Sequence, residues 1–260
     1  MPLDLDTGPI GGELDADVLV IGAHWDAFAE WFTAIWEHGH HVALIGPTRQ
    51  GKTNLLIELG RLRPYAVILD SKGMDRTLQE SGYRRIGAWP PPSDVWDDIA
   101  DGLPAHLLIG GPVRSDQEWD RLASVISDAL TGVFQAHGSW TVGVDELQIT
   151  SQMMGLKRKI ERNLIAAADR GVTMITGYQA PSWVPTAASR QARWLFLYPT
   201  RDEDVIKNVA AKAGRPWRDL KEALHVLPDY HVLVAGTNPR VPLVITHAPK
   251  QTPRRTRNDT

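Results

Sequence analysis

Short runs of aliphatic and β-branched residues alternate along the chain with longer segments in which apolar residues recur at every third or fourth position. The short runs predict strands and the longer segments predict helices, an order typical of parallel strands joined by crossover helices. The expected strands are Val18–Ile21, Val42–Ile45, Ala66–Leu69, His106–Ile109, Thr141–Val144, Val172–Thr176, Trp194–Tyr198, His231–Ala235 and Val241–Ile245. The expected helices are Trp25–Glu37, Thr53–Leu62, Asp116–His137, Lys157–Arg170, Asp202–Ala213 and Trp217–Leu224. The pattern predicts an α/β fold with a central, mostly parallel sheet and helices on both faces.

Both ends of the chain depart from this pattern. Residues 1–17 are acidic and contain glycine and proline, whereas residues 248–260 are basic and polar. We expect a flexible N-terminal leader and a disordered C-terminal tail on either side of a single domain formed by residues 18–247. Within that domain, the prolines of Trp89–Ser93 predict a surface loop.

The sequence contains no cysteine, which excludes disulfides and thiolate metal sites. No apolar run approaches the roughly 18 residues that a membrane-spanning helix needs. We therefore expect a cytoplasmic protein without a membrane partner.

Residues 46–53 carry the pattern G-x-x-x-x-G-K-[ST] at the point where an expected strand gives way to an expected helix. Glycines let the backbone N–H groups of such a loop turn inward around phosphates, and the N-terminal end of the helix favours the same negative charge. Lys52 is expected to hold the β- and γ-phosphates, and Thr53 the Mg²⁺ ion. The loop therefore predicts a site for a nucleoside triphosphate. The residues expected to contact it are Gly46, Pro47, Thr48, Arg49, Gln50, Gly51, Lys52, Thr53 and Asn54.

Arg49 stands where many loops of this kind have a third glycine. Two alternatives remain open: Arg49 adopts an ordinary backbone conformation, or it adds a positive charge beside the nucleotide. Both concern the affinity for the nucleotide, and neither changes the expectation that one binds.

The expected strand at 141–144 ends directly in Asp145 and Glu146, the order of a Walker B element followed by a catalytic carboxylate. Asp145 would orient Mg²⁺ through its water shell, and Glu146 would position and polarise the attacking water. An acidic pair after a strand is also common as a plain turn or helix cap. Downstream of a phosphate-binding loop the catalytic interpretation is favoured, and with it hydrolysis by water over phosphoryl transfer to a second substrate.

The next expected strand, at 172–176, leads into Gln179. A glutamine that leaves a strand beside the Walker B strand can reach the γ-phosphate and report its presence. The alternative is a loop glutamine that is merely solvated.

Together these motifs resemble the FtsK/HerA branch of additional-strand P-loop ATPases, over about residues 40–247. The resemblance implies a three-layer, RecA-like P-loop fold that uses ATP and Mg²⁺. It also implies a homo-oligomeric ring that surrounds double-stranded DNA. The matching pieces are Gly46-x4-Gly51-Lys52-Thr53, Asp70-Ser-Lys72-Gly73-x-Asp75, Val144-Asp145-Glu146, Ala168-Asp-Arg170-Gly171 and Gln179-x-Pro181-Ser182.

In such motors an arginine from the neighbouring subunit completes each site and stabilises charge in the transition state. The resemblance puts Arg170, Arg190 and Arg193 where the trans-acting basic residues of the family fall, with Arg193 slightly favoured. The alternative for each is a surface arginine, and Arg170 also ends an expected helix whose macrodipole favours a positive charge.

Charge is divided unevenly along the chain. Residues 1–130 contain 10 Lys and Arg against 20 Asp and Glu, whereas residues 131–260 contain 18 against 11. The basic half can face a polyanion, or its charges can lie on solvated faces. The segment Gln152–Lys159 would then be a DNA-facing loop in which Lys157, Arg158 and Lys159 contact phosphates without reading bases. A solvated helix start is the alternative.

The sequence thus favours an ATP-hydrolysing motor that translocates double-stranded DNA, of the kind that viruses or plasmids use for DNA packaging or transfer. A capsid portal or a nuclease would be a further partner, and a viral protein of this kind would act in the host cytoplasm. One alternative is a DNA-processing translocase that works with a separate nuclease. Another is a nucleotide-switched binding module with little hydrolysis. Turnover stimulated by DNA separates both motors from the binding module.

Overall fold

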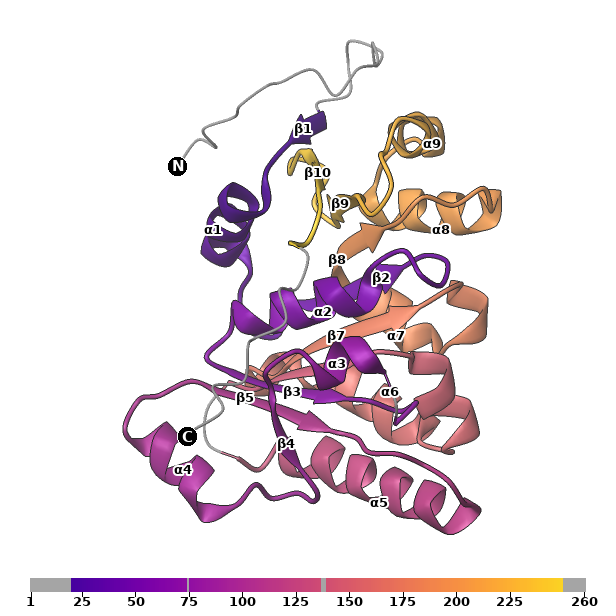
Figure 1. Ribbon diagram of the computed structural model, residues 1–260. Helices are drawn as coiled ribbons and strands as arrows, with labels where there is room; N and C mark the ends of the chain where they lie inside the picture. The colour runs from indigo at the N-terminus through magenta and orange to yellow at the C-terminus, as the bar shows by residue number, and fades with distance from the viewer. Residues whose placement is uncertain (1–19, 74, 137–138, 250–260) are drawn as a thin grey trace.

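The computed structural model describes residues 20–249 except 74, 137 and 138. Within that part of the chain, ten strands form one sheet in the order β1-β10-β9-β8-β2-β7-β6-β3-β5-β4 (Figure 1). Neighbouring strands are parallel from β8 through to β4, whereas β9 runs antiparallel to both β8 and β10. The strands are β1 Val20–Gly22, β2 His41–Ile45, β3 Tyr65–Leu69, β4 Arg84–Ile86, β5 Ala105–Ile109, β6 Thr141–Val144, β7 Thr173–Tyr178, β8 Ala192–Leu197, β9 Val232–Gly236 and β10 Leu243–Thr246.

Alternate residues of each strand point to opposite faces of the sheet, so each face has its own apolar core. Val42 and Leu44 of β2 belong to one core, which the helices α1 (Trp25–Ile35), α2 (Lys52–Arg61) and α3 (Arg76–Gln79) cover. Ala43 and Ile45 belong to the other core. The helices that cover it are α4 (Ser93–Ala100), α5 (Asp116–Gly132), α6 (Lys157–Ala166), α7 (Thr186–Gln191), α8 (Glu203–Ala213) and α9 (Trp217–His225). The three-layer α/β architecture predicted from the sequence is confirmed.

Aromatic side chains of α1 pack against the sheet. Phe28 and Phe32 lie one helical turn apart, are fully buried, and meet the ring of Phe196 on β8 edge-on, with centroids 6.0 and 5.5 Å apart. Trp36, just past the helix, stacks on Phe32 at 5.0 Å. The aromatic residues of this helix therefore pack the core, as their spacing predicts.

The predicted elements are all present, with shifts at their ends. The helix predicted at Asp116–His137 ends at Gly132, and His137 lies outside the described residues. The helix predicted at Lys157–Arg170 ends at Ala166 and is followed by a 3₁₀ turn at Ala168–Arg170. The leader at residues 1–17 and residues 250–260 of the expected tail also lie outside the described part.

Three short α-helices, α3, α4 and α7, and one short strand, β4, were not predicted. β4 has three residues, and two of them, Arg84 and Arg85, are exposed, so it carries almost no apolar signal. The predicted surface loop at Trp89–Ser93 is confirmed as a loop over residues 89–92, between β4 and α4, and differs in two respects. Ser93 begins α4 directly after Pro92. Trp89 is half-buried, with its ring 5.4 Å from that of the buried Trp140.

No helix among the described residues combines the length and the apolar character needed to cross a membrane.

Candidate functional site

The carboxyl ends of four neighbouring parallel strands, β2, β7, β6 and β3, meet at one edge of the sheet. In open α/β sheets this edge is where ligands bind. The residues that leave these strands are Gly46–Thr53 after β2, Gln179 after β7, Asp145 and Glu146 after β6, and Asp70–Gly73 after β3. The fold therefore brings the separate sequence motifs to one place.

The phosphate-binding loop turns at its two glycines. Gly46 and Gly51 have φ angles of 155° and 95°, and a Cβ atom on Gly46 would lie 2.5 Å from the Cβ of Tyr198. Gly51 immediately precedes α2, so the helix begins at Lys52 and its first N–H groups point into the loop. The strand, loop and helix predicted here are confirmed.

Arg49 has a φ angle of 64°, in the left-handed region that glycine adopts most readily. The alternative in which Arg49 keeps an ordinary backbone conformation is therefore wrong. Its side chain lines the cavity described below, in agreement with the alternative that it adds a positive charge there.

Lys52 is buried and closes the loop on itself. Its Nζ donates to the carbonyl oxygens of Gly46, at 2.7 Å, and of Pro47, at 2.5 Å. Burial lowers the pKa of Lys52, while the nearby carboxylates of Glu146 and Asp145 act in the opposite direction. A lysine in this position offers its charge to any anion that enters the loop.

Thr53 and Asp145 join the loop to the Walker B strand. The Oγ1 of Thr53 donates to Oδ1 of Asp145 at 2.7 Å. α2 can approach β6 closely because residue 143 is glycine, and a Cβ atom there would lie 2.9 Å from Leu56 of α2. The hydroxyl and the carboxylate are the oxygen donors that Mg²⁺ takes in phosphate sites, so these residues fit the ion.

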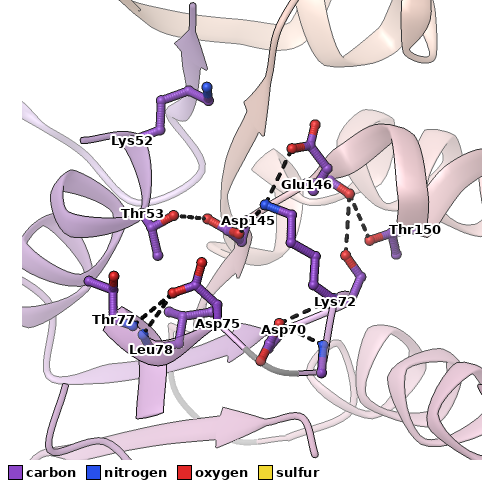
Figure 2. A network of polar contacts seen from close by, with 12 residues as sticks. Lys52, Thr53, Asp70, Lys72, Asp75, Thr77, Leu78, Asp145, Glu146 and Thr150 are labelled. Atoms are coloured by element: carbon purple, nitrogen blue, oxygen red, sulfur yellow. Dashed lines mark hydrogen bonds and ion pairs between the residues drawn. The ribbon is translucent and has the colours of Figure 1, made fainter. Parts of the chain in front are cut away.

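Lys72 lies between the two acidic side chains (Figure 2). Its Nζ is 3.2 Å from Oδ2 of Asp145 and 3.5 Å from Oε2 of Glu146. Burial alone would lower the pKa of Lys72, but the two carboxylates outweigh it and raise that pKa. The loop is shaped by Asp70, whose Oδ1 accepts from the N–H groups of Lys72, at 3.2 Å, and Gly73, at 2.9 Å.

Glu146 is buried and held through its backbone. Its carbonyl oxygen accepts from Oγ1 of Thr150, at 3.2 Å, and from Oγ of Ser71, at 3.4 Å. Its Oε2 faces Lys72, whereas its Oε1 is buried and has no hydrogen-bond partner among the described residues. A buried carboxylate oxygen without a partner is costly unless it serves a ligand or a reaction. Of the two carboxylate oxygens of Glu146, Oε1 is thus the one that the contact with Lys72 does not engage.

These side chains border a cavity of about 380 Å³. It is lined by Thr48, Arg49, Gly51, Lys52, Thr53, Asn54, Lys72, Asp75, Thr77, Asp145, Glu146 and Tyr230. Most of the predicted nucleotide and metal residues thus share one cavity with the predicted catalytic carboxylate.

Gln179 directly follows β7, whose last residue pairs with the last residue of β2. It is half-buried next to the phosphate-binding loop but is not among the residues that line the cavity. The prediction that it reports the γ-phosphate stays a prediction.

The three candidate trans-acting arginines lie at the opposite edge of the sheet. Arg193 follows the first residue of β8, which pairs with the first residue of β2, and Arg170 and Arg190 precede β7 and β8. All three are exposed, and Arg170 donates to the carbonyl oxygen of Phe134 at 3.2 Å. An arginine at this edge reaches a nucleotide cavity only if that cavity belongs to another subunit.

The segment Gln152–Lys159 is not the loop that was predicted. Ile149–Met153 forms a π-helical turn and Lys157 begins α6, so the alternative of a helix start is confirmed. Lys157 and Arg158 are exposed. Lys159 is tied to α5 instead, because its Nζ donates to the backbone oxygen of Ser127 at 2.9 Å and to its Oγ at 2.5 Å.

Four residues that line the cavity were missed as site residues from the sequence: Lys72, Asp75, Thr77 and Tyr230. Lys72 belongs to the Asp-x-Lys-Gly motif, which the sequence analysis identified without assigning a function to the lysine. Tyr230 lies in the loop between α9 and β9 and lines the same cavity. No sequence motif marks Tyr230, and only the return of β9 beside β8 brings it to this edge.

Solved structures with a similar fold include the following three. The genome packaging NTPase B204 of Sulfolobus turreted icosahedral virus 2, in complex with AMPPCP, matches at 16% identity over 82% of this chain and 98% of its own, with a TM-score of 0.55. The cytoplasmic domain of the type VII secretion ATPase EccC of Thermomonospora curvata matches at 16% identity over 82% and 25%, with a TM-score of 0.55. The bacterial conjugative coupling protein TrwBΔN70 matches at 12% identity over 83% and 86%, with a TM-score of 0.53.

No protein-family model matches the sequence, and no curated protein does. At these identities the similarity concerns the fold, and it agrees with the resemblance found in the motifs. The chain has the RecA-like fold of the FtsK/HerA-type P-loop ATPases.

Proposed function

We propose that this protein is an ATP-hydrolysing motor that moves double-stranded DNA as a homo-oligomeric ring. Packaging or transfer of viral or plasmid DNA is the role that its structural neighbours suggest, since one is a genome packaging NTPase and another a conjugative coupling protein. A capsid portal or a nuclease would be its further partner.

One observation supports hydrolysis above all. Lys52, the Thr53–Asp145 pair and Glu146 line a single cavity, and Oε1 of Glu146 is a buried acceptor with no partner among the described residues. A module that only bound nucleotide would need the loop and the lysine but would have no use for this second carboxylate.

The residues divide the work of hydrolysis between them. Lys52 binds the β- and γ-phosphates when its ammonium turns from the loop carbonyls to the nucleotide. Glu146 takes a proton from a water molecule as that water attacks the γ-phosphorus, and the bond between this phosphorus and the bridging oxygen of the β-phosphate breaks, releasing ADP and phosphate. Thr53 and Asp145 would hold Mg²⁺, which neutralises charge that develops on the phosphate oxygens.

Lys72 would supply a positive charge to the site in addition to those of Lys52 and Mg²⁺. Its ammonium contacts both Asp145 and Glu146, so it orients the two carboxylates with respect to each other. It also lies in the cavity within reach of an anion bound there.

The test is ATP turnover by the full chain, measured alone, with duplex DNA and with heparin, a polyanion that offers charge without a helical track. The mass of the assembly is measured in parallel. We expect hydrolysis that duplex DNA stimulates several-fold more than heparin, by a particle whose mass is a multiple of 28.8 kDa. Tight binding of ATP with negligible turnover would identify a nucleotide-switched module instead. Turnover indifferent to DNA would rule out a DNA motor.

A further inference from the structure

Tyr230 is a large aromatic residue that the fold leaves uncovered beside the phosphate-binding loop. Its side chain is 61% exposed and lines the cavity together with Lys52 and Thr53. Its Cδ1 lies 3.8 Å from the point where a Cβ atom on Gly51 would be. The ring therefore stands at the open side of the loop, next to the start of α2.

The backbone holds Tyr230 in place at some cost. Its φ angle is 62°, a left-handed conformation that bulky residues rarely adopt. Such outliers persist where the surrounding structure enforces them, and they cluster at ligand sites. Here the next residue, His231, donates its N–H to the carbonyl of Pro228, and its ring lies 4.7 Å from the ring of His247.

The residues that follow β10 close the same corner. β10 pairs with β9 so that Thr246 lies opposite Val232, two residues after Tyr230. Beyond it, the carbonyl of Pro249 accepts from Nδ2 of Asn54 at 2.6 Å. Asn54 is the second residue after Lys52 and also lines the cavity. The corner is thus built from α2, the loop before β9 and the end of β10.

We propose that the ring of Tyr230 is the platform on which the base of the bound nucleotide stacks. This inference rests on the proposed function, because it assumes that Lys52 and Thr53 hold the phosphate end. Among the described residues that line the cavity, Tyr230 is the only aromatic one, so its ring is the surface there that a base can stack on. The carboxylates of Asp145 and Glu146 pair with Lys72, at 3.2 and 3.5 Å, and neither pairs with Tyr230.

Stacking on an aromatic ring strengthens binding but discriminates poorly among bases, because each base has a π-face. The ligand class is therefore a nucleoside triphosphate, and the ring itself does not select one base. Tyr230 should contribute by the same factor to adenine and guanine nucleotides.

The test compares two variants, Tyr230→Ala and Tyr230→Phe, by calorimetric titration with AMPPCP, GMPPCP and inorganic tripolyphosphate. Tripolyphosphate occupies the phosphate end but has no base. Tyr230→Ala should weaken both nucleotides by about 5- to 150-fold, the range for one stacked base, and should leave tripolyphosphate unchanged. Tyr230→Phe, which keeps the ring, should bind all three probes like the parent. Trp183→Ala is the matched control, since Trp183 is an exposed aromatic residue that does not line the cavity.

The outcomes separate this inference from the proposed function. Unchanged nucleotide affinity in Tyr230→Ala would overturn the stacking role and leave the ATPase intact. Equal losses for nucleotides and tripolyphosphate would show that Tyr230 only shapes the loop. A loss confined to AMPPCP would also overturn the proposal, because a ring that acts only by stacking serves both bases. A parent protein that binds none of the three probes would overturn the proposed function itself.

Discussion

The Nζ of Lys72 lies 3.2 Å from Oδ2 of Asp145, so the carboxylate that ends the Walker B strand is shared between a lysine on one oxygen and Thr53 on the other. Asp145 and Glu146 are adjacent, buried and both within reach of this one ammonium. Their mutual repulsion is therefore offset in part by a residue from the loop after β3.

Replacing Lys72 with methionine should lower the free energy of unfolding by on the order of 1–2 kcal/mol, because two buried carboxylates lose their ion-pair partner. The expected loss is modest because the ammonium of Lys72 is partly exposed to solvent, which weakens the ion pairs in the parent. Mg²⁺ offers a replacement charge, so millimolar MgCl₂ should restore more stability to Lys72→Met than to the parent. Urea unfolding in MgCl₂ and in EDTA measures this difference. Lys207→Met, which removes an exposed pair with Glu203, is the control. A deficit of equal size in both buffers would contradict the prediction.

The two central site residues should fail in different ways. Lys52→Ala removes the charge that holds the phosphates and should weaken nucleotide binding by about tenfold or more. Glu146→Gln keeps the shape of the side chain but removes the acceptor for the water proton, so binding should persist while turnover falls by about 10²-fold or more. Nucleotide titration and phosphate release report the two properties separately. Glu30→Gln, on the exposed face of α1, controls for loss of a carboxylate. Near-normal turnover in Glu146→Gln would show that this residue is not the base.

An arginine acting between subunits should come from the edge of the sheet opposite the cavity. Loss of the correct one among Arg170, Arg190 and Arg193 should cost on the order of 10³-fold in turnover. In rings that mix this variant with Lys52→Ala subunits, some sites combine an intact loop with an intact arginine, so part of the activity should return. Arg240→Ala provides a surface control. If mixing never restores activity for any of the three, completion of the site by a neighbour is not supported.

Contacts to duplex DNA should depend on the exposed pair at the start of α6. Lys157→Ala with Arg158→Ala should weaken binding equally for unrelated sequences and reduce the salt slope by up to about one per lost contact. Lys159→Ala should affect stability more than DNA, because its ammonium ties α6 to Ser127 of α5. Binding isotherms at several salt concentrations measure both effects. The control is Lys207→Ala with Arg218→Ala, which removes the same charge elsewhere. An unchanged salt slope in the first double variant would mean that DNA lies on another face.

Gly177 is a further position where a single methyl group should disturb the site. A Cβ atom there would lie 2.4 Å from the backbone oxygen of Asp145. Gly177→Ala should therefore push β7 away from the end of β6 and lower the free energy of unfolding by about 1–3 kcal/mol. Turnover should also fall, because Asp145 and Glu146 follow β6 directly. Thermal unfolding and phosphate release test this. A Cβ on Gly87 meets nothing within 4 Å, so Gly87→Ala should change neither property. Full activity in Gly177→Ala would contradict the tight contact.

The central part of the fold and of the site could be predicted because the signals are local. The phosphate-binding loop and the Asp145–Glu146 pair each directly follow an apolar strand, and the carboxyl ends of parallel strands necessarily share an edge. The short elements were not predicted because they carry little apolar pattern. Two of the three residues of β4 are exposed arginines, and α3 has only four residues. α4 follows a run of prolines, which tolerate the start of a helix but suggest a loop.

What the sequence did not predict depends on distant partners. Arg49 carries no sign of its left-handed backbone, since the rest of the loop enforces it. Tyr230 becomes a site residue only through the pairing of β9 with β8 and β10. The role of Lys72 required knowing that the loops after β3 and β6 face each other, which the neighbouring order of these two strands decides.

The pairing of β1 with β10 has a consequence for synthesis on the ribosome. Val20 lies beside Leu243 and Ile21 beside Val244, so the first strand of the described chain has no place in the sheet until nearly all of that chain has emerged. β2, β3, β6 and β7, which carry the phosphate loop and both carboxylates, are complete by Tyr178. Because a domain generally folds as a unit, the described chain can complete its sheet only after β10 has been made. The strand made first then joins among the last.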